Sequence, residues 1–249
     1  VIVNGTYGLN TTIYEIRGVE VSLERFGIPI ERVYTDINGN FTFSYTGTLG
    51  TRLRLNLEDK YSPHRIAVYD FENNQTHPAW LLTPTFQTGA PSEANITMRI
   101  AADNTVVYEL NGSRFNPIRP GDTNIAPDRF AHLAVIYHHT YLASQFTTEN
   151  LGLTMNHTLP VEIYAFSAMD IDLNGVNDTF YNPTLSQIWI NITDSYYSPP
   201  HGTNAPDNRE FHEFSHHIMT DSLIGGDNRL PWSPGENNHG GYYVNPTSC

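Results

Sequence analysis

The spacing of apolar residues changes once along the chain, near residue 126, and this change limits the fold more than any other feature. Before it, apolar and polar residues alternate in GVEVSLER (18–25), GNFTFSYTG (39–47) and RLRLNLE (52–58). Such alternation between turn signals predicts strands with one buried face. After it, apolar residues recur at helical spacing. We therefore expect an α+β protein whose strands come first.

The first predicted helix begins at Pro127, a residue that suits the first turn of a helix. The run YHHTY (137–141) within it is expected to lie in the core and at its rim. Two predicted strands, LPVEIYAFSA and LSQIWINIT, then precede a second helix. The apolar residues at helical spacing in the first helix are Phe130, Leu133, Ala134, Tyr137 and Tyr141.

These patterns divide the chain into three segments. We predict a β-rich module in 1–60, which on a wider reading extends to about 110, a β-rich connecting region in 61–125, and a third unit in 126–249. The connecting region contains three further predicted strands, RIAVYD, NITMRIA and TVVYEL. The one cysteine, Cys249, excludes an internal disulfide framework, so the fold cannot be stabilised by such bridges.

The first segment contains a V-x-V strand in GVEVSLE, followed by a T-D-x-x-G-x-F-x-F hairpin in RVYTDINGNFTFSY. Over about 45 residues this order resembles the carboxypeptidase-regulatory, transthyretin-like family. The resemblance implies an N-terminal antiparallel β-sandwich. In that family such modules usually accompany another domain and carry no chemistry.

The charge of the chain limits its partners. It has 26 acidic and 13 basic residues, a net charge of −13, which disfavours nucleic acid and anionic membranes. No apolar run approaches the roughly 18–20 residues that cross a bilayer, so we expect no membrane span in this segment. The chain begins with Val and has no signal-peptide pattern, which indicates a processed product or a piece of a longer protein.

Asn-x-Ser/Thr motifs indicate the compartment. Nine occur, roughly twice the number that the composition gives by chance. They predict a glycoprotein that is extracellular or at the cell surface. The candidate glycosylation sites are Asn4, Asn10, Asn40, Asn74, Asn95, Asn111, Asn156, Asn177 and Asn191.

The motif with the clearest chemistry is His-Glu-x-x-His in REFHEFSHHIM (209–219). On a helix, His212 and His216 are about one turn apart on one face, so two ring nitrogens can bind one zinc ion. Glu213 lies beside that face, where its carboxylate can take a proton from zinc-bound water. Asp207 and Glu210 predict a capped start for this helix.

The other side of the motif helix is expected to pack against the core. Phe211, Phe214 and Ile218 predict an apolar face roughly opposite the two histidines. His217 lies off the ligand face and is expected to be structural.

The element order from Pro127 onward, HEFSHHIM and the later NNHGGYYVNPTSC together resemble the gluzincin clan of zinc metallopeptidases. The resemblance implies a zinc cofactor, a peptide or protein substrate and the cleavage of peptide bonds. It also implies that the strand before the motif helix, SQIWIN (186–191), is an edge strand that binds substrate as an added strand.

Gluzincins take their third zinc ligand from a glutamate on a following helix. Glu236 lies at a compatible separation from His216, but Pro234 and Gly235 beside it predict a loop. The chain also resembles peptidases in which a stretch like NHGGY runs into a glutamate-bearing helix. On that reading the third ligand lies beyond Cys249 and the domain is truncated. The sequence is also compatible with His239 as the third ligand, and with a chain that binds no metal.

A second candidate metal site lies in DIDLNGVND (170–178). Asp170, Asp172, Asn174 and Asp178 have the spacing of a calcium-binding loop. However, Tyr181 stands where such a loop has its twelfth-position glutamate. A calcium site and a polar, Asx-rich turn both fit this stretch.

These features predict a secreted or cell-surface zinc metalloendopeptidase with Glu213 as general base. The alternative is an extracellular structural or filament subunit, a glycosylated homopolymer on a peptidase-like scaffold with little or no activity. Stoichiometric zinc and chelator-sensitive peptide hydrolysis distinguish the two.

Overall fold

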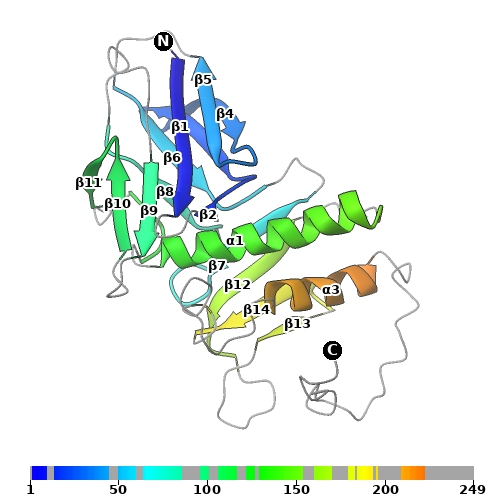
Figure 1. Ribbon diagram of the computed structural model, residues 1–249. Helices are drawn as coiled ribbons and strands as arrows, with labels where there is room; N and C mark the ends of the chain where they lie inside the picture. The colour runs from blue at the N-terminus through cyan, green and yellow to red at the C-terminus, as the bar shows by residue number, and fades with distance from the viewer. Residues whose placement is uncertain are drawn as a thin grey trace, which may run out of the picture.

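The computed structural model describes residues 2–9, 14–44, 50–59, 64–85, 96–100, 106–116, 122–126, 129–153, 160–169, 179–182, 184–192, 195 and 209–221. These residues form a mixed α+β protein in which strands predominate (Figure 1). The strands are β1 (Ile2–Leu9), β2 (Tyr14–Glu15), β3 (Glu20–Arg25), β4 (Ile28–Tyr34), β5 (Asn40–Ser44), β6 (Arg52–Asn56), β7 (Ile66–Asp70), β8 (Trp80–Leu82), β9 (Ile96–Ile100), β10 (Val106–Leu110), β11 (Ser113–Phe115), β12 (Val161–Ser167), β13 (Phe180–Asn182) and β14 (Gln187–Asn191). The helices are α1 (Phe130–Gln145), the π-helical turn η1 (Phe146–Asn150) and α3 (Arg209–Asp221).

The alternating segments form the expected strands. GVEVSLER and RLRLNLE contain β3 and β6, which pair antiparallel in a sheet of order β4-β3-β6-β8. Their apolar side chains, including Val21, Leu23, Leu53 and Leu55, are fully buried. A second sheet has the order β11-β10-β9-β1-β2, with β5 paired to β1. The prediction of strands with one buried face is confirmed for β5 and β6, whereas β3 is buried on both faces, with Ser22 and Glu24 only 2% and 4% exposed.

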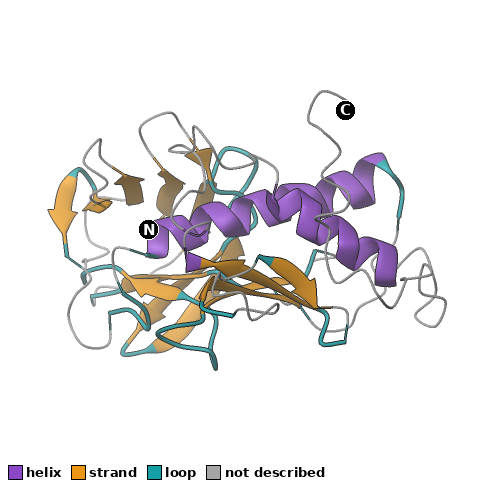
Figure 2. Ribbon diagram, turned by 90° about the horizontal axis from the view of Figure 1, so that it is seen from below, coloured by secondary structure: helices purple, strands orange, loops and turns teal. Residues whose placement is uncertain are grey.

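The third sheet has the order β13-β14-β12-β7. Strands β7, β12 and β14 are parallel, whereas β13 runs antiparallel to β14. Strand β7 comes from the segment that the sequence assigns to the connecting region, so this sheet is built from both sides of residue 126. The helices α1 and α3 lie on one side of it (Figure 2). No helix in the described part of the chain is long and apolar enough to cross a membrane.

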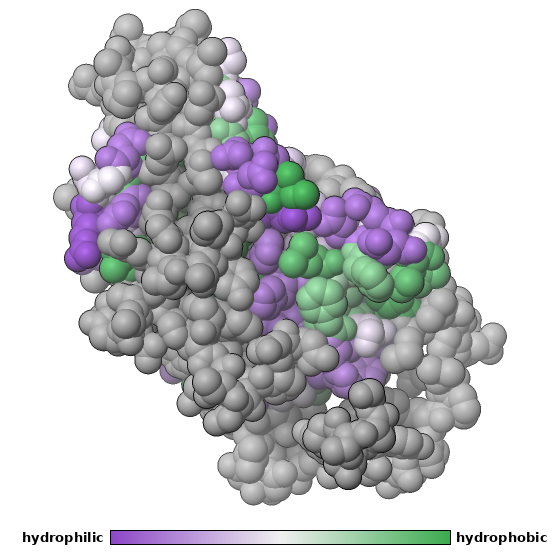
Figure 3. Space-filling model, in the orientation of Figure 1, coloured by the Kyte–Doolittle hydropathy of each residue, from purple (hydrophilic) through white to green (hydrophobic). Residues whose placement is uncertain are grey.

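Helix α1 is buried on almost every side. Its residues from Phe130 to Thr140 are all buried, including His138 and His139, as expected for a core position. Burial on all sides is typical of a helix in a core with neighbours on several sides. Burial ends after this stretch, where Phe146 and Leu151 are 51% and 56% exposed. On the face shown in Figure 3, apolar side chains gather in a patch to the right of centre.

The turn before β3 touches α1 directly. The Tyr137 hydroxyl donates a hydrogen bond to the Gly18 carbonyl oxygen at 2.6 Å. Burial raises the pKa of Tyr137 well above its ordinary value, so the hydroxyl remains a donor. Gly18 has a φ of +74°, and a Cβ there would lie 2.3 Å from Cε2 of Tyr141. Only glycine allows this backbone to approach the helix so closely.

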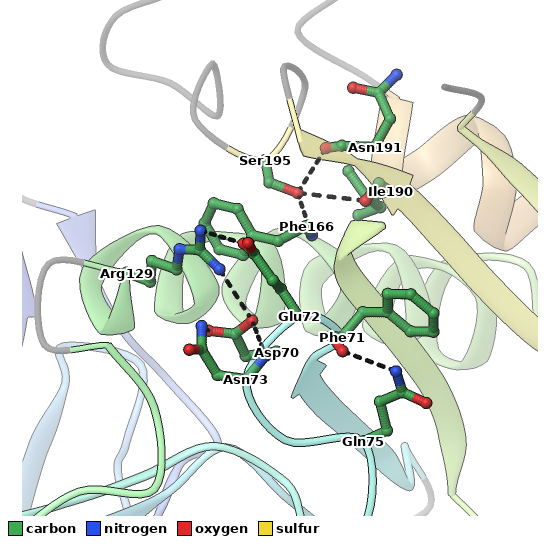
Figure 4. Close-up of polar contacts among 10 residues, drawn as sticks. All are labelled: Asp70, Phe71, Glu72, Asn73, Gln75, Arg129, Phe166, Ile190, Asn191 and Ser195. Atoms are coloured by element: carbon green, nitrogen blue, oxygen red, sulfur yellow. Dashed lines mark hydrogen bonds and ion pairs between the residues drawn. The ribbon is translucent and has the colours of Figure 1, made fainter. Parts of the chain in front are cut away.

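Arg129 joins the N-terminal end of α1 to the third sheet (Figure 4). Its Nη1 donates to Oδ1 of the fully buried Asp70 at 3.2 Å, and its Nη2 pairs with Glu72. The guanidinium also lies 4.4 Å from the ring centroid of Phe166. Phe166 has a φ of +57°, and its backbone N–H donates to Ser195 Oγ at 2.8 Å. An ion pair with a fully buried carboxylate therefore anchors the residue that precedes α1.

Aromatic side chains line the side of the third sheet that faces away from the helices. Trp189 alternates with the buried Ile188 and Ile190 along β14, so its ring lies on the opposite side. It stacks on Tyr164 at 4.8 Å, and Tyr164 stacks on Tyr69 at 4.9 Å. Burial and the neighbouring carboxylate of Glu162 raise the pKa of Tyr164 to about 12. These rings cover a face that no described helix covers.

Replacing Gly18 by alanine tests the close approach to α1. The positive φ alone should cost about 1–2 kcal/mol, and the overlap with Tyr141 should add ~1–3 kcal/mol. Gly27→Ala is the matched control, because Gly27 has a φ of +77° and no atom within 4 Å of its Cβ position. Urea unfolding of both variants gives the difference. Equal losses of stability would contradict the contact.

The burial of His138 predicts a pH-dependent stability. Burial, with contributions from His139 and Arg17, lowers the pKa of His138 to about 3. In the unfolded chain, His138 binds a proton with the ordinary histidine pKa of 6.5. Between pH 3 and 6.5 the unfolded state therefore holds more protons than the folded state. Stability should fall as the pH falls from 6.5 to 3, by up to about 1.4 kcal/mol per pH unit from this residue.

Urea unfolding at a series of pH values measures this dependence. His138→Gln should flatten it, whereas His77→Gln, at an exposed position, is the matched control. The same slope in wild type and His138→Gln would show that His138 does not contribute.

Candidate metal centre

Helix α3 has the expected buried side and a side that faces away from the core. Phe214 and Ile218 are 1% and 5% exposed and pack in the main apolar cluster. His212 is exposed and His216 is partly exposed. The motif helix therefore presents its two histidines on the side opposite its apolar contacts, as the sequence predicts.

The two histidines point their Nε2 atoms at the same place. These atoms lie 3.2 Å apart, and the ring planes make an angle of 84°. Zn–N bonds of about 2.0–2.1 Å at a tetrahedral angle place two ligand nitrogens about 3.3 Å apart. The separation also suits a hydrogen bond between two neutral rings. The geometry thus fits zinc without requiring it.

Glu213 lies beside this pair and is only 8% exposed. Its Oε1 is 4.0 Å from Nε2 of His212. A carboxylate at this distance can reach a water molecule held between the two Nε2 atoms. The core on one side of Glu213 and the two histidines on the other orient its carboxylate toward the position of this water.

Two expectations for α3 differ from the structure. Phe211 is 37% exposed, so it does not join the apolar face predicted for it. Its neighbour Glu210 is 2% exposed, and its Oε2 lies 3.6 Å from Nδ1 of His139 on α1. The carboxylate predicted to cap the helix thus faces a buried imidazole, which the helix-start pattern alone does not reveal. Asp207 lies outside the described residues.

The edge-strand prediction for 186–191 is wrong. Strand β14 (Gln187–Asn191) is paired on both sides, with β12 and with β13. Among the described strands, β13 (Phe180–Asn182) ends the sheet on this side. The sequence did not predict it because three residues give no readable period. Tyr181 of β13 contacts α3, its hydroxyl lying 3.3 Å from Nδ1 of the buried His217.

Several candidate metal ligands lie outside the described residues. They are Glu236, His239 and the calcium candidates Asp170, Asp172, Asn174 and Asp178. In the described part of the chain, no group of three His, Cys, Asp or Glu side chains is arranged to hold a metal ion. The residues that could hold zinc there are His212 and His216.

The described Asn-x-Ser/Thr sites differ in their surroundings. Asn40 at the start of β5 and Asn111 in the β10–β11 turn are exposed. Asn74 and Asn191 are partly buried, and the side-chain oxygen of Asn74 accepts hydrogen bonds from the backbone and hydroxyl of Thr76. Asn4 lies in β1. Outside the described residues are Asn10, Asn95, Asn156 and Asn177.

Comparison with known proteins gives no relative. No protein-family model, no curated protein and no solved structure matches the chain.

Proposed function

We propose that this chain is a secreted or cell-surface zinc-dependent peptidase of the gluzincin type, with a transthyretin-like β-sandwich as its N-terminal accessory module. The observation that carries the proposal is the 3.2 Å separation of the two Nε2 atoms of His212 and His216. The match to the nitrogen spacing of a zinc ion, within a His-Glu-x-x-His helix, supports it.

His212 and His216 would hold the zinc ion, which when bound lowers the pKa of a coordinated water and polarises a carbonyl group. Glu213 is the general base. Its carboxylate accepts a proton from the attacking water and donates it to the nitrogen of the leaving amine. Within this sequence, the third ligand is sought among Glu236 and His239.

Strand β13 is the proposed binding strand for a peptide substrate. In the described sheet it is paired only with β14, and it lies beside α3 (Figure 1). An extended peptide can add to such an edge through backbone hydrogen bonds. This assignment moves the substrate strand of the gluzincin resemblance from 186–191 to 180–182.

A second candidate function is that of a structural subunit that forms homopolymers. The observation that favours it is the β3–β4 hairpin, where Phe26, Ile28 and Ile30 are 83%, 68% and 42% exposed. Apolar side chains gathered on a terminal strand are a site at which another chain can pair or pack.

Glu213→Gln tests the peptidase proposal. The variant should keep its zinc, because Glu213 is not a ligand, but its peptide hydrolysis should fall by about 10²–10⁴ through loss of the base. Zinc content by elemental analysis and cleavage of an unfolded protein substrate measure the two effects. Glu149→Gln, at an exposed carboxylate, is the matched control.

A chelator should abolish hydrolysis by the wild-type protein, and added zinc should restore it. A wild-type protein without zinc or hydrolysis, with a sedimentation coefficient that rises with concentration, would reject the peptidase and support the structural subunit. Loss of that concentration dependence in Ile28→Lys would assign the contact to the hairpin.

The exposure of the asparagine sites predicts which of them carry glycans in the secreted protein. Asn40 and Asn111 should be occupied, because their side chains are accessible on the folded surface. Mass spectrometry of peptides before and after glycan removal measures occupancy, and Asn40→Gln and Asn111→Gln should each remove one glycan. Unmodified Asn40 and Asn111 in the secreted protein would contradict the proposed glycosylation.

A further inference from the structure

The buried side of α3 carries two polar residues that flank the His-Glu-x-x-His motif. Glu210 precedes the motif and His217 follows it, and they are 2% and 1% exposed. Seven residues separate them, which is two turns, so both lie on the same side of the helix. Glu210 contacts α1, and His217 contacts β13. Figure 1 shows α3 between these two elements.

The first contact is between α3 and α1. Oε2 of Glu210 lies 3.6 Å from Nδ1 of His139, and both side chains are buried. His139 is held on a helix that is itself fixed on almost every side. The carboxylate of Glu210 therefore faces an imidazole on a buried helix, at a distance slightly longer than a hydrogen bond.

The second contact is between α3 and β13. The hydroxyl of Tyr181 lies 3.3 Å from Nδ1 of His217, and the two ring centroids are 5.7 Å apart in an edge-to-face arrangement. Tyr181 belongs to the strand that we propose binds substrate. This contact thus links the motif helix to the substrate strand directly.

Buried polar pairs of this kind are a poor source of stability. Taking a carboxylate out of water is expensive, and apolar side chains of similar size often stabilise a core more. What such pairs supply is direction, because a polar contact holds only at one rotation of the helix. The apolar contacts of Phe214 and Ile218 are non-directional and allow α3 to turn.

The rotation of α3 matters to a metal site. Side-chain atoms lie about 5–6 Å from a helix axis, so a turn of roughly 20° moves an imidazole nitrogen by about 2 Å. Metal–ligand distances tolerate only about 0.2 Å. The helix itself fixes the spacing of His212 and His216. Their position relative to a third ligand and to β13 depends on the rotation.

We propose that Glu210–His139 and His217–Tyr181 are positioning contacts that set the rotation of α3, and thereby place the two zinc-binding histidines relative to the third ligand and the substrate strand. The inference rests on the zinc site proposed above. The side chains of Glu210, His139, Tyr181 and His217 bind neither zinc nor substrate on this view, and the substrate contacts proposed for β13 are made by its backbone. These side chains act through the helix that carries the ligands.

The test uses the whole chain, depleted of metal and titrated with Zn²⁺ alone and with Co²⁺ alone. In the double variant His139→Leu/Glu210→Leu, the thermal midpoint of the metal-free protein should equal or exceed that of wild type. Its zinc affinity should nevertheless fall about 10–100-fold, the usual effect of losing an outer partner. The visible absorption of bound Co²⁺, which reports ligand geometry, should change.

Tyr181→Phe is the second variant, for the case in which the double variant does not fold. It keeps the ring and removes the hydroxyl that reaches His217, so zinc affinity should fall and the Co²⁺ spectrum should change with little loss of stability. Tyr34→Phe, on the exposed outer side of β4, is the matched control. Glu210→Gln alone, which keeps a polar side chain opposite His139, should retain much of the affinity that the double variant loses.

The outcomes separate the two proposals. Wild type that binds no zinc overturns both. Wild type that binds zinc, together with folded variants whose zinc affinity and Co²⁺ spectrum match wild type, overturns the positioning role and leaves the zinc site intact. If zinc affinity falls together with the thermal midpoint and the Co²⁺ spectrum does not change, the contacts serve packing alone. This result also overturns the positioning role.

Discussion

The burial of α1 is the constraint on which the rest of the described structure depends. Gly18 of the N-terminal module approaches it through a contact that no side chain at that position would permit. At its N-terminal end, Arg129 connects it to Asp70 of β7. Just past its middle, His139 meets Glu210 of α3. One helix therefore connects the N-terminal strands, the third sheet and the motif helix.

A helix in this position must satisfy its polar groups inside the protein, because water cannot reach them. Tyr137 does so by donating to a backbone carbonyl, and its raised pKa keeps the donor proton in place. For His138, burial lowers the pKa and so keeps the ring neutral. The chain places the polar residues of the run YHHTY inside the core, where the Tyr137 contact holds only while Gly18 lies beside it.

Much of the fold could be predicted from the sequence, because the spacing of apolar residues survives in the long elements. Strands β3, β5 and β6 and both helices were predicted from it. Strand β4 was not, since its apolar residues Ile28 and Ile30 point outward and hide the period. Strand β13 is too short for a period. That omission misplaced the sheet edge, although the motif helix itself was predicted correctly.

The contacts that orient the site could not be predicted, because they join residues far apart in sequence. Glu210 was predicted to cap its own helix, and its partner His139 lies 71 positions earlier in the chain. Such pairs appear only when two helices are packed together. One feature of α3 nevertheless pointed to this contact. The charged Glu210 and the aromatic Phe211 occupy adjacent positions, and only one of them can face the core.

Hydrophobicity alone would bury Phe211 and expose Glu210, and the structure does the reverse. Turning α3 so that Phe211 packed inward would move His212 toward the core but carry His216, about 40° further round the helix, away from it. The observed rotation leaves His212 exposed and His216 partly exposed, and it buries the carboxylate of Glu210. A helix selected for stability alone has no reason to accept the cost of burying a carboxylate. The arrangement is understandable if the rotation of α3 serves to place the imidazoles of His212 and His216.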